Sequence, residues 1–188
     1  MKSSEAKKKR VLIVSPHPDD AELGMGGTMI SLKSKGHSVY LIDLTSGEPT
    51  PEGSVPRRRK ESREADRILK IDKRISLGFR NRYLSDTKKE RLALAEKIRL
   101  IKPDVIFCPH PIDAHPDHIA ASKISETARF YAKYTKVTLK GSPHYVPVFF
   151  NYFCSHLRRI PEFTFLVDIT SCFESKIEAV SCYRSQFI

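Results

Sequence analysis

Two short clusters of histidine and carboxylate residues stand out in this sequence of 188 residues. The first cluster is Pro16-His17-Pro18-Asp19-Asp20-Ala21-Glu22. A turn at Pro18 would let His17 and Asp20 point toward one centre, and imidazole nitrogen and carboxylate oxygen are ordinary zinc ligands at about 2.0–2.2 Å. Asp19 lies between them and stays free for another role. The alternative is a polar loop in which Asp19 or Asp20 caps the following helix.

The second cluster, Asp113-Ala114-His115-Pro116-Asp117-His118, again places two histidines beside an acid. His118 could supply a third zinc ligand, and a site with three protein ligands leaves one position for water. His115 would then lie at the rim of the metal, where Asp117 could fix its tautomer and favour its protonated form. The alternative is a loop with surface histidines. Spacing favours no ligand role for the remaining histidines, which are His37, His110, His144 and His156.

The glycine-rich stretch Gly24-Met25-Gly26-Gly27 follows the first cluster. A strand, a glycine-rich turn and a helix are typical of dinucleotide-binding folds. The spacing departs from that fingerprint, because Met29 stands where the third glycine is needed. Close packing of the helix on the sheet explains these glycines more simply.

Strand and helix patterns alternate along the chain, and this alternation must position the two clusters. The predicted strands cover residues 11–15, 38–44, 74–77, 104–108, 146–154 and 163–169, and the predicted helices cover 26–35, 57–69, 88–101, 117–133 and 171–182. We therefore expect a single α/β domain, Rossmann-like, with a mostly parallel sheet and helices on both faces. In such sheets ligands bind beyond the carboxyl ends of the strands. Each cluster directly follows a predicted strand, so the two loops meet if those strands are neighbours.

The formal net charge of +11 raises the question of a nucleic-acid partner. Five basic residues lie among the first ten, which predicts a flexible basic tail over residues 1–9. The remaining excess is scattered apart from Arg57-Arg58-Arg59-Lys60, and it suits a small anionic substrate as well as a phosphate backbone. No run reaches the roughly 20 apolar residues of a membrane helix. We therefore expect a cytoplasmic protein with no membrane and no nucleic-acid partner.

The two clusters resemble the hallmarks of the LmbE/PIG-L-like zinc-dependent deacetylases, P/A-H-P-D-D-x-E and H-P-D-H. Further similarity lies in Leu44–Gly53, Asn81–Leu84 and Tyr183–Phe187, and it extends over nearly the whole chain. The sequence looks most similar to the bacillithiol-biosynthesis branch, the N-acetylglucosaminyl malate deacetylases. The resemblance implies an LmbE-like domain over residues 10–188, in a sequence that stops before the usual C-terminal extension of the family.

The resemblance also implies a role for eight residues. They are the zinc ligands His17, Asp20 and His118; the general base Asp19; His115 paired with Asp117 for transition-state stabilisation; and the substrate contacts Arg58 and Arg82. It further implies one Zn²⁺ per chain, a small anionic sugar substrate and a homo-oligomer, either a trimer or a hexamer.

The function predicted in this way is hydrolytic removal of acetate from N-acetylglucosaminyl malate. One alternative is the same chemistry on another N-acetylglucosamine derivative or a chitooligosaccharide. An alternative from a different class is a basic α/β module that binds nucleic acid. The absence of tryptophan and of an aromatic set near the basic run disfavours that module.

Overall fold

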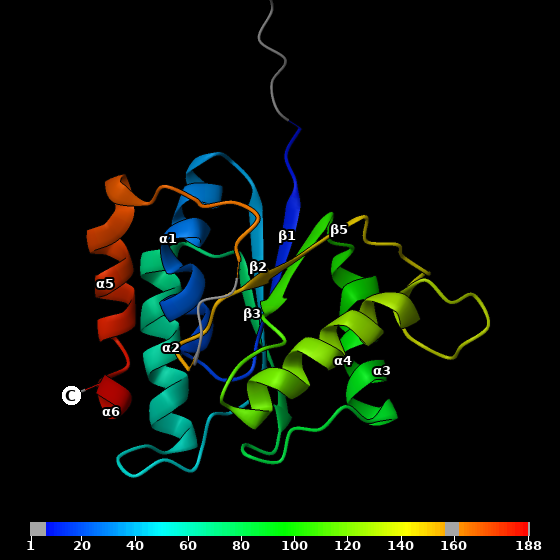
Figure 1. Ribbon diagram of the computed structural model, residues 1–188, viewed down its shortest axis with the longest axis horizontal. Helices are drawn as coiled ribbons and strands as arrows, with labels where there is room; N and C mark the ends of the chain where they lie inside the picture. Colours follow the sequence, from blue (N-terminus) through cyan, green and yellow to red (C-terminus); the bar gives the residue numbers. More distant parts are fainter. Residues whose placement is uncertain (1–6, 157–161, 188) are drawn as a thin grey trace, which may run out of the picture.

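The computed structural model describes residues 7–156 and 162–187 (Figure 1). Strands and helices alternate along most of the chain. Their order is β1 (Arg10–Ser15), α1 (Asp20–Ser34), β2 (Ser38–Thr45), α2 (Val55–Leu69), β3 (Lys73–Phe79), α3 (Lys88–Ile101), β4 (Val105–Pro109), α4 (Pro116–Ala132), β5 (Val148–Tyr152), a 3₁₀ turn (Thr170–Cys172), α5 (Phe173–Ser181) and α6 (Arg184–Phe187).

The five strands form one parallel sheet in the order β3-β2-β1-β4-β5. Helices α1, α2 and α5 cover one face and α3 and α4 the other (Figure 1). This arrangement confirms the predicted α/β fold with helices on both faces. The direction of winding reverses between the central strands β1 and β4, and in doubly wound sheets that reversal opens a crevice at the carboxyl ends of the strands.

Alternation along the central strands supplies both halves of the core. Leu12 of β1 and Ile42 of β2 pack with α3 and α4. Ile13 follows Leu12 on β1 and Leu41 precedes Ile42 on β2, and these two side chains pack with α1 and α2 on the other face. All four side chains are fully buried. Because both faces of a parallel sheet are covered, its strands are near-continuous apolar runs, which is why the sequence showed them clearly.

The predicted strand over residues 163–169 is wrong. The structure gives residues 162–169 no regular secondary structure. This segment packs on helix α1 instead of joining the sheet, since a Cβ added at Gly27 would lie 2.7 Å from the side chain of Ile169. Asp168 then accepts hydrogen bonds from the backbone N–H and hydroxyl of Thr170, which turn the chain into α5.

Helix α1 begins at Asp20, well before the predicted start at residue 26. Asp20 and Glu22 lie in its first turn, where carboxylates interact favourably with the positive end of the helix dipole. The glycines that follow allow close packing, as expected. A Cβ on Gly24 would lie 2.5 Å from the backbone oxygen of Phe153, next to β5.

Of the predicted basic tail, residues 7–9 are described, and they are exposed and lie outside any helix or strand. Residues 1–6 lie outside the described part of the chain. Among the described residues, none of the helices combines the length and apolar character required to cross a bilayer.

Candidate metal centre

The two histidine–carboxylate clusters meet at one end of the sheet. His17, Asp19 and Asp20 lie at the junction of β1 and α1, and His115 and the first turn of α4 follow β4. Because β1 and β4 are paired neighbours, the two loops face each other. The cavity there has a volume of about 280 Å³, and it is lined by the predicted residues His17, Asp19, Asp20, Arg58, Arg82, His115 and His118.

Three of these residues direct ligand atoms at one point. Asp20 Oδ2 lies 2.9 Å from His17 Nδ1 and 3.2 Å from His118 Nε2. One ligand atom from each of the three buried residues lies within 4.8 Å of the others. Ligands of a tetrahedral zinc ion, at about 2.1 Å from the metal, stand about 3.4 Å from one another. The donor types and their separations therefore fit a divalent cation such as zinc.

Each histidine of this set is held by a second carboxylate through its other nitrogen. His118 Nδ1 lies 3.0 Å from Asp113 Oδ2, and His17 Nε2 lies 3.1 Å from Asp117 Oδ2. A carboxylate partner on the remote nitrogen fixes the tautomer and the ring orientation of a metal-binding histidine. Asp113 was not among the residues predicted from the sequence, although it begins the second cluster.

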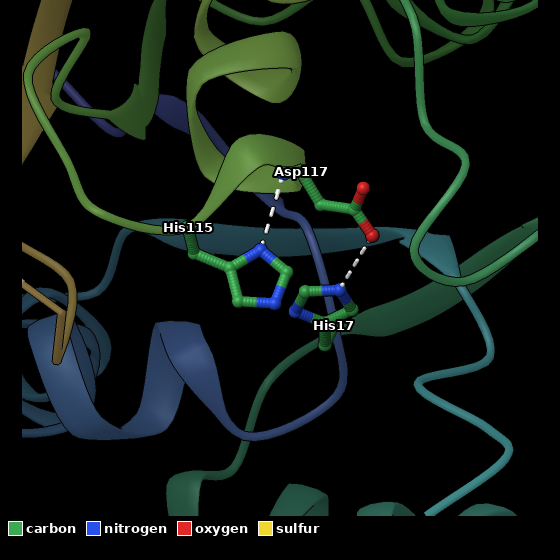
Figure 2. Close-up of side chains that lie close together, drawn as sticks. All are labelled: His17, His115 and Asp117. Atoms are coloured by element: carbon green, nitrogen blue, oxygen red, sulfur yellow. Dashed lines mark hydrogen bonds and ion pairs between the residues drawn. The ribbon is translucent and has the colours of Figure 1, made fainter.

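His115 and Asp117 are in contact as expected, but through the backbone of Asp117 and not through its carboxylate. Figure 2 shows that this carboxylate contacts His17, whereas His115 Nδ1 accepts a hydrogen bond of 3.1 Å from the backbone N–H of Asp117. The physical reason is that His115 is the N-cap of α4 and turns back onto the first turn of the helix. Asp117 also accepts hydrogen bonds from the backbone N–H groups of Arg82 and Leu84.

The electrostatics of the three candidate ligands favour positive charge at their centre. Burial by itself lowers the pKa of His17, but hydrogen bonds to Asp117 and Asp20 outweigh burial and raise it to about 9. The pKa of His118 is raised in the same way, since contact with Asp20 outweighs burial. Burial opposes ionisation of Asp20, but the two histidines lower its pKa below the usual range. Protons thus supply the positive charge that a metal ion would bring, and the ion must displace a proton from His17.

Among the described residues, two other sets of donor atoms share a histidine with this site. One set is His17, His115 and Asp117, and the other is Asp113, His118 and Cys154. In both sets the metal would bind a histidine nitrogen that already contacts a carboxylate: His17 Nε2 contacts Asp117, and His118 Nδ1 contacts Asp113. Burial also raises the pKa of the Cys154 thiol strongly, so that it stays protonated and is a poor ligand. We therefore favour His17, Asp20 and His118 as the ligands.

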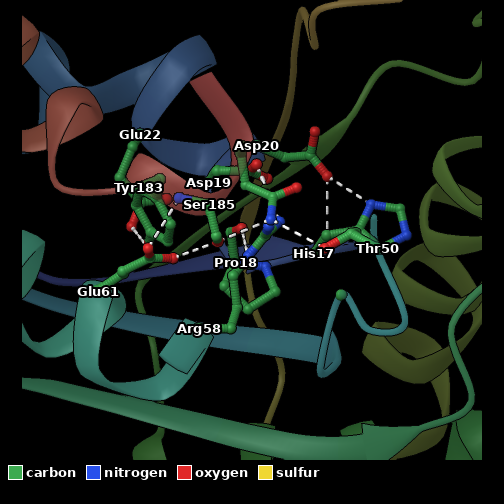
Figure 3. A network of polar contacts seen from close by, with 12 residues as sticks. His17, Pro18, Asp19, Asp20, Glu22, Thr50, Arg58, Glu61, Tyr183 and Ser185 are labelled. Atoms are coloured by element: carbon green, nitrogen blue, oxygen red, sulfur yellow. Dashed lines mark hydrogen bonds and ion pairs between the residues drawn. The ribbon is translucent and has the colours of Figure 1, made fainter. Parts of the chain in front are cut away.

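Asp19 lines the cavity beside the ligand set without belonging to it. Its backbone has φ 121° and ψ −32°, a conformation that is rare for residues other than glycine. Burial raises its pKa well above the usual range, the Asp20 carboxylate adds to this effect, and Arg58 opposes it. Arg58 Nη2 donates to Asp19 Oδ2 at 2.9 Å (Figure 3). A carboxyl group with a raised pKa next to a metal site is suited to carry a proton.

The two predicted substrate contacts differ in their surroundings. Arg58 is buried, with 3% of its surface exposed, and is paired with Asp19. Arg82 is exposed, has φ 66°, and donates through Nη2 to the backbone oxygen of Pro49 at 3.1 Å. Of these two arginines, only Arg82 is exposed at the cavity.

His156 is a cavity residue that the sequence did not single out. Its ring centroid lies 5.7 Å from that of His115 and 5.6 Å from that of His118. The sequence contained one indication of this position. His156 follows the predicted strand over residues 146–154, and in a parallel sheet the carboxyl ends of all strands lie at the same edge. The other three histidines without a predicted role lie away from this cavity: His37 accepts from the backbone of Lys9, His110 packs on Phe153 and His144 contacts the backbone oxygen of Pro103.

Comparison with known proteins places this geometry among deacetylases. The family model described as PIG-L, GlcNAc-PI de-N-acetylase, matches residues 12–129. The chain is 30% identical to diacetylchitobiose deacetylase of Thermococcus kodakarensis, covering 95% of this chain and 70% of that protein. It is 28% identical to a probable N-acetyl-alpha-D-glucosaminyl L-malate deacetylase of Bacillus anthracis, over 95% of this chain and 82% of that one.

Two solved structures show the same fold. A conserved protein from Thermus thermophilus is 41% identical and superposes with a TM-score of 0.90, covering 95% of this chain and 80% of that one. The N,N'-diacetylchitobiose deacetylase from Pyrococcus horikoshii is 29% identical with a TM-score of 0.84, covering 97% of this chain and 72% of that one.

Proposed function

Because the chain belongs to the PIG-L (LmbE-like) family of de-N-acetylases, we propose that it hydrolyses the acetamide group of an N-acetylglucosamine-type substrate with the help of a bound zinc ion. The observation that carries this proposal is the convergence of His17 Nδ1, Asp20 Oδ2 and His118 Nε2, with the separate carboxylate of Asp19 in the same cavity. His17, Asp20 and His118 would hold the ion, whose chemistry when bound is Lewis acidity toward water and toward the acetamide carbonyl.

Asp19 moves the proton in this mechanism. It accepts a proton from water as the water oxygen forms a bond to the acetamide carbon. The C–N bond then breaks, and the same proton passes from Asp19 to the sugar nitrogen, so that the sugar leaves as an amine and acetic acid is formed, which ionises to acetate in water. The shuttle needs Asp19 as a carboxylate first and as a carboxylic acid afterwards: Arg58 lowers its pKa and favours the carboxylate, whereas burial raises the pKa and helps the group to hold the proton between the two steps.

His115 stabilises the negative charge that develops on the acetamide oxygen. Burial lowers its pKa, and the neighbouring His118 and His17 lower it further, so the protonated form expected from the sequence is not favoured. The hydrogen bond from the Asp117 backbone N–H makes Nδ1 an acceptor, which assigns the proton of the neutral ring to Nε2. We propose that His115 acts as a neutral hydrogen-bond donor through Nε2.

We expect His115→Ala to lower kcat by about 100-fold, the loss typical of removing one donor to an oxyanion. Zinc content should stay at the wild-type level, since the three ligands do not include His115. Steady-state kinetics and metal analysis of the same preparations measure both quantities. His110→Ala is the matched control, because His110 also follows β4 but packs on Phe153. Equal losses of metal and activity in His115→Ala would contradict the assigned role.

For the substrate, we propose N-acetylglucosaminyl malate, with the exposed Arg82 binding its carboxylates. The similarity to diacetylchitobiose deacetylases supports a neutral chitooligosaccharide as the second candidate. The basic run on α2 favours neither candidate, because Arg58 is buried and Arg57 pairs with Glu61 at 3.3 Å.

An amine-release assay on both substrates and on N-acetylglucosamine tests the proposal. We expect kcat/KM for the malate conjugate to exceed that for diacetylchitobiose by about tenfold, and Arg82→Gln to remove this preference, as expected for one charge-assisted contact. A higher kcat/KM for diacetylchitobiose would favour the second candidate. No amine release from any of the three by the zinc-loaded protein would contradict the proposed function.

A further inference from the structure

We infer that Leu23 is a specificity-determining residue, whose side chain contacts the methyl of the substrate's acetyl group and limits the length of the acyl chain. The inference rests on the proposed function, because it concerns the substrate of the same metal cavity. It begins from the lining of that cavity, which is mostly polar. Among the described residues that line it, Leu23 and Phe187 are the two with hydrocarbon side chains.

Leu23 lies directly beside the reacting groups. It follows the candidate ligand Asp20 by three residues in α1, and its backbone N–H donates to the backbone oxygen of the proton carrier Asp19 at 2.9 Å. A helical side chain leans toward the N-terminus of its helix and covers the preceding turn. The side chain of Leu23 is therefore directed over the turn that carries the two carboxylates.

The acetyl methyl has to lie in the same part of the cavity. The proposed reaction brings the acetamide carbon to the candidate metal ligands and to Asp19, and the methyl carbon is bonded to that carbon at about 1.5 Å. The side chains of the ligands and of Asp19 are polar or charged. Because removal of a methyl group from water into apolar contact is favourable, Leu23 supplies the surface that the methyl requires.

Phe187 is less suited to this contact. It belongs to α6, and the side chain of the preceding Gln186 donates to Thr50 Oγ1 at 3.1 Å, which attaches this short helix to the loop after β2. Phe187 is 46% exposed, whereas Leu23 is half-buried. A group bonded to the reacting carbon is covered by the residue next to the ligands, so the methyl contact is with Leu23.

Helix α1 cannot move aside to admit a longer acyl chain at this point. A Cβ on Gly24, the next residue, would lie 2.5 Å from the backbone oxygen of Phe153 and 2.7 Å from Tyr152 Cδ2, so the helix is packed tightly against the end of β5. The hydroxyl of Tyr152 donates to the backbone oxygen of Val14 at 3.0 Å, which connects this contact to the central strand. A longer chain therefore has to displace the Leu23 side chain itself.

The test compares acyl derivatives of one sugar. The amine product of the preferred substrate is reacylated with an acetyl, propionyl or butyryl group, and amine release gives kcat/KM for each. In the wild-type zinc enzyme we expect kcat/KM for the acetyl derivative to exceed that for the butyryl derivative by about 100-fold or more, because one methylene in an apolar pocket changes kcat/KM by about 10- to 200-fold. Leu23→Ala should lower this preference by about tenfold or more, and Leu23→Val by less.

The acetyl preference is a ratio of two kcat/KM values measured on one preparation, so a reduced fraction of folded or zinc-loaded protein cancels. A variant of lower stability is thus still informative, and Leu23→Val serves if Leu23→Ala does not fold. Leu32→Ala is the matched control, because Leu32 lies on the same helix and packs on the core. Its acetyl preference should equal that of the wild type, and zinc content is measured alongside.

Three outcomes would overturn the inference while the wild type is active. One is an equal kcat/KM for the acetyl and butyryl derivatives in the wild type, which would mean that the acyl chain is not limited at all. Another is an unchanged acetyl preference in the Leu23 variants. The third is an equal loss of preference in Leu32→Ala. If the wild type releases no amine from any derivative, the proposed function fails, and the inference fails with it.

Discussion

Asp19→Asn is expected to lower kcat by about 1,000-fold while the protein keeps its zinc, since a positioned general base contributes about 10²–10⁴-fold. The asparagine amide has nearly the shape of the carboxylate but cannot take a proton from water. It can still occupy the space beside Arg58, so the strained loop conformation and the ligands on either side should persist. Steady-state kinetics on the preferred substrate and metal analysis of the same sample measure the two effects.

Asp86→Asn is the matched control for this variant. Asp86 pairs with Arg91 at 2.6 Å outside the cavity, and a surface pair of this kind contributes little. Full activity in Asp19→Asn would show that another group carries the proton. Loss of zinc in that variant would instead place Asp19 among the ligands.

The second large effect is expected from Asp20→Asn. Asp20 is the one carboxylate in the favoured ligand set, and its Oδ2 contacts both histidine rings. We expect the affinity for zinc to fall by about 100-fold or more, because even the loss of a supporting group around a metal ligand costs about 10- to 100-fold. Competition with a chelator of known affinity measures the change.

A thermal experiment gives an independent reading of the same prediction. A ligand that binds the folded state raises the melting temperature, so zinc should stabilise the wild type and not Asp20→Asn. Asp113→Asn, which removes only the partner of His118 Nδ1, should show an intermediate loss of affinity. Zinc binding of wild-type strength in Asp20→Asn would remove this carboxylate from the ligand set.

The sequence predicted the parts of the molecule that depend on local pattern. The buried strands β1 and β4 were visible as apolar runs, and the rule that ligands bind beyond the ends of parallel strands brought His17 and His118 together across about 100 residues of chain. The structure agrees because β1 and β4 are adjacent at the point where the winding reverses.

What the sequence could not provide depends on contacts between distant elements. The carboxylate of Asp117 reaches His17 only because α4 approaches the first loop at a particular angle. Burial of Arg58 follows from the way α2 packs on that loop, and spacing within α2 carries no sign of it. Glu22 is a further example. It belongs to the first histidine–carboxylate cluster of the sequence, but its carboxylate contacts Arg74 and the hydroxyl of Tyr183, which are far away in the chain.

The central claim is that two imidazoles and one carboxylate from two separate loops hold a single divalent ion. Anomalous diffraction at the zinc edge, from crystals grown with zinc, locates the ion directly. The account predicts one strong peak about 2.0–2.2 Å from His17 Nδ1, Asp20 Oδ2 and His118 Nε2. A peak between His17 Nε2, His115 and Asp117, or beside Cys154, would contradict it.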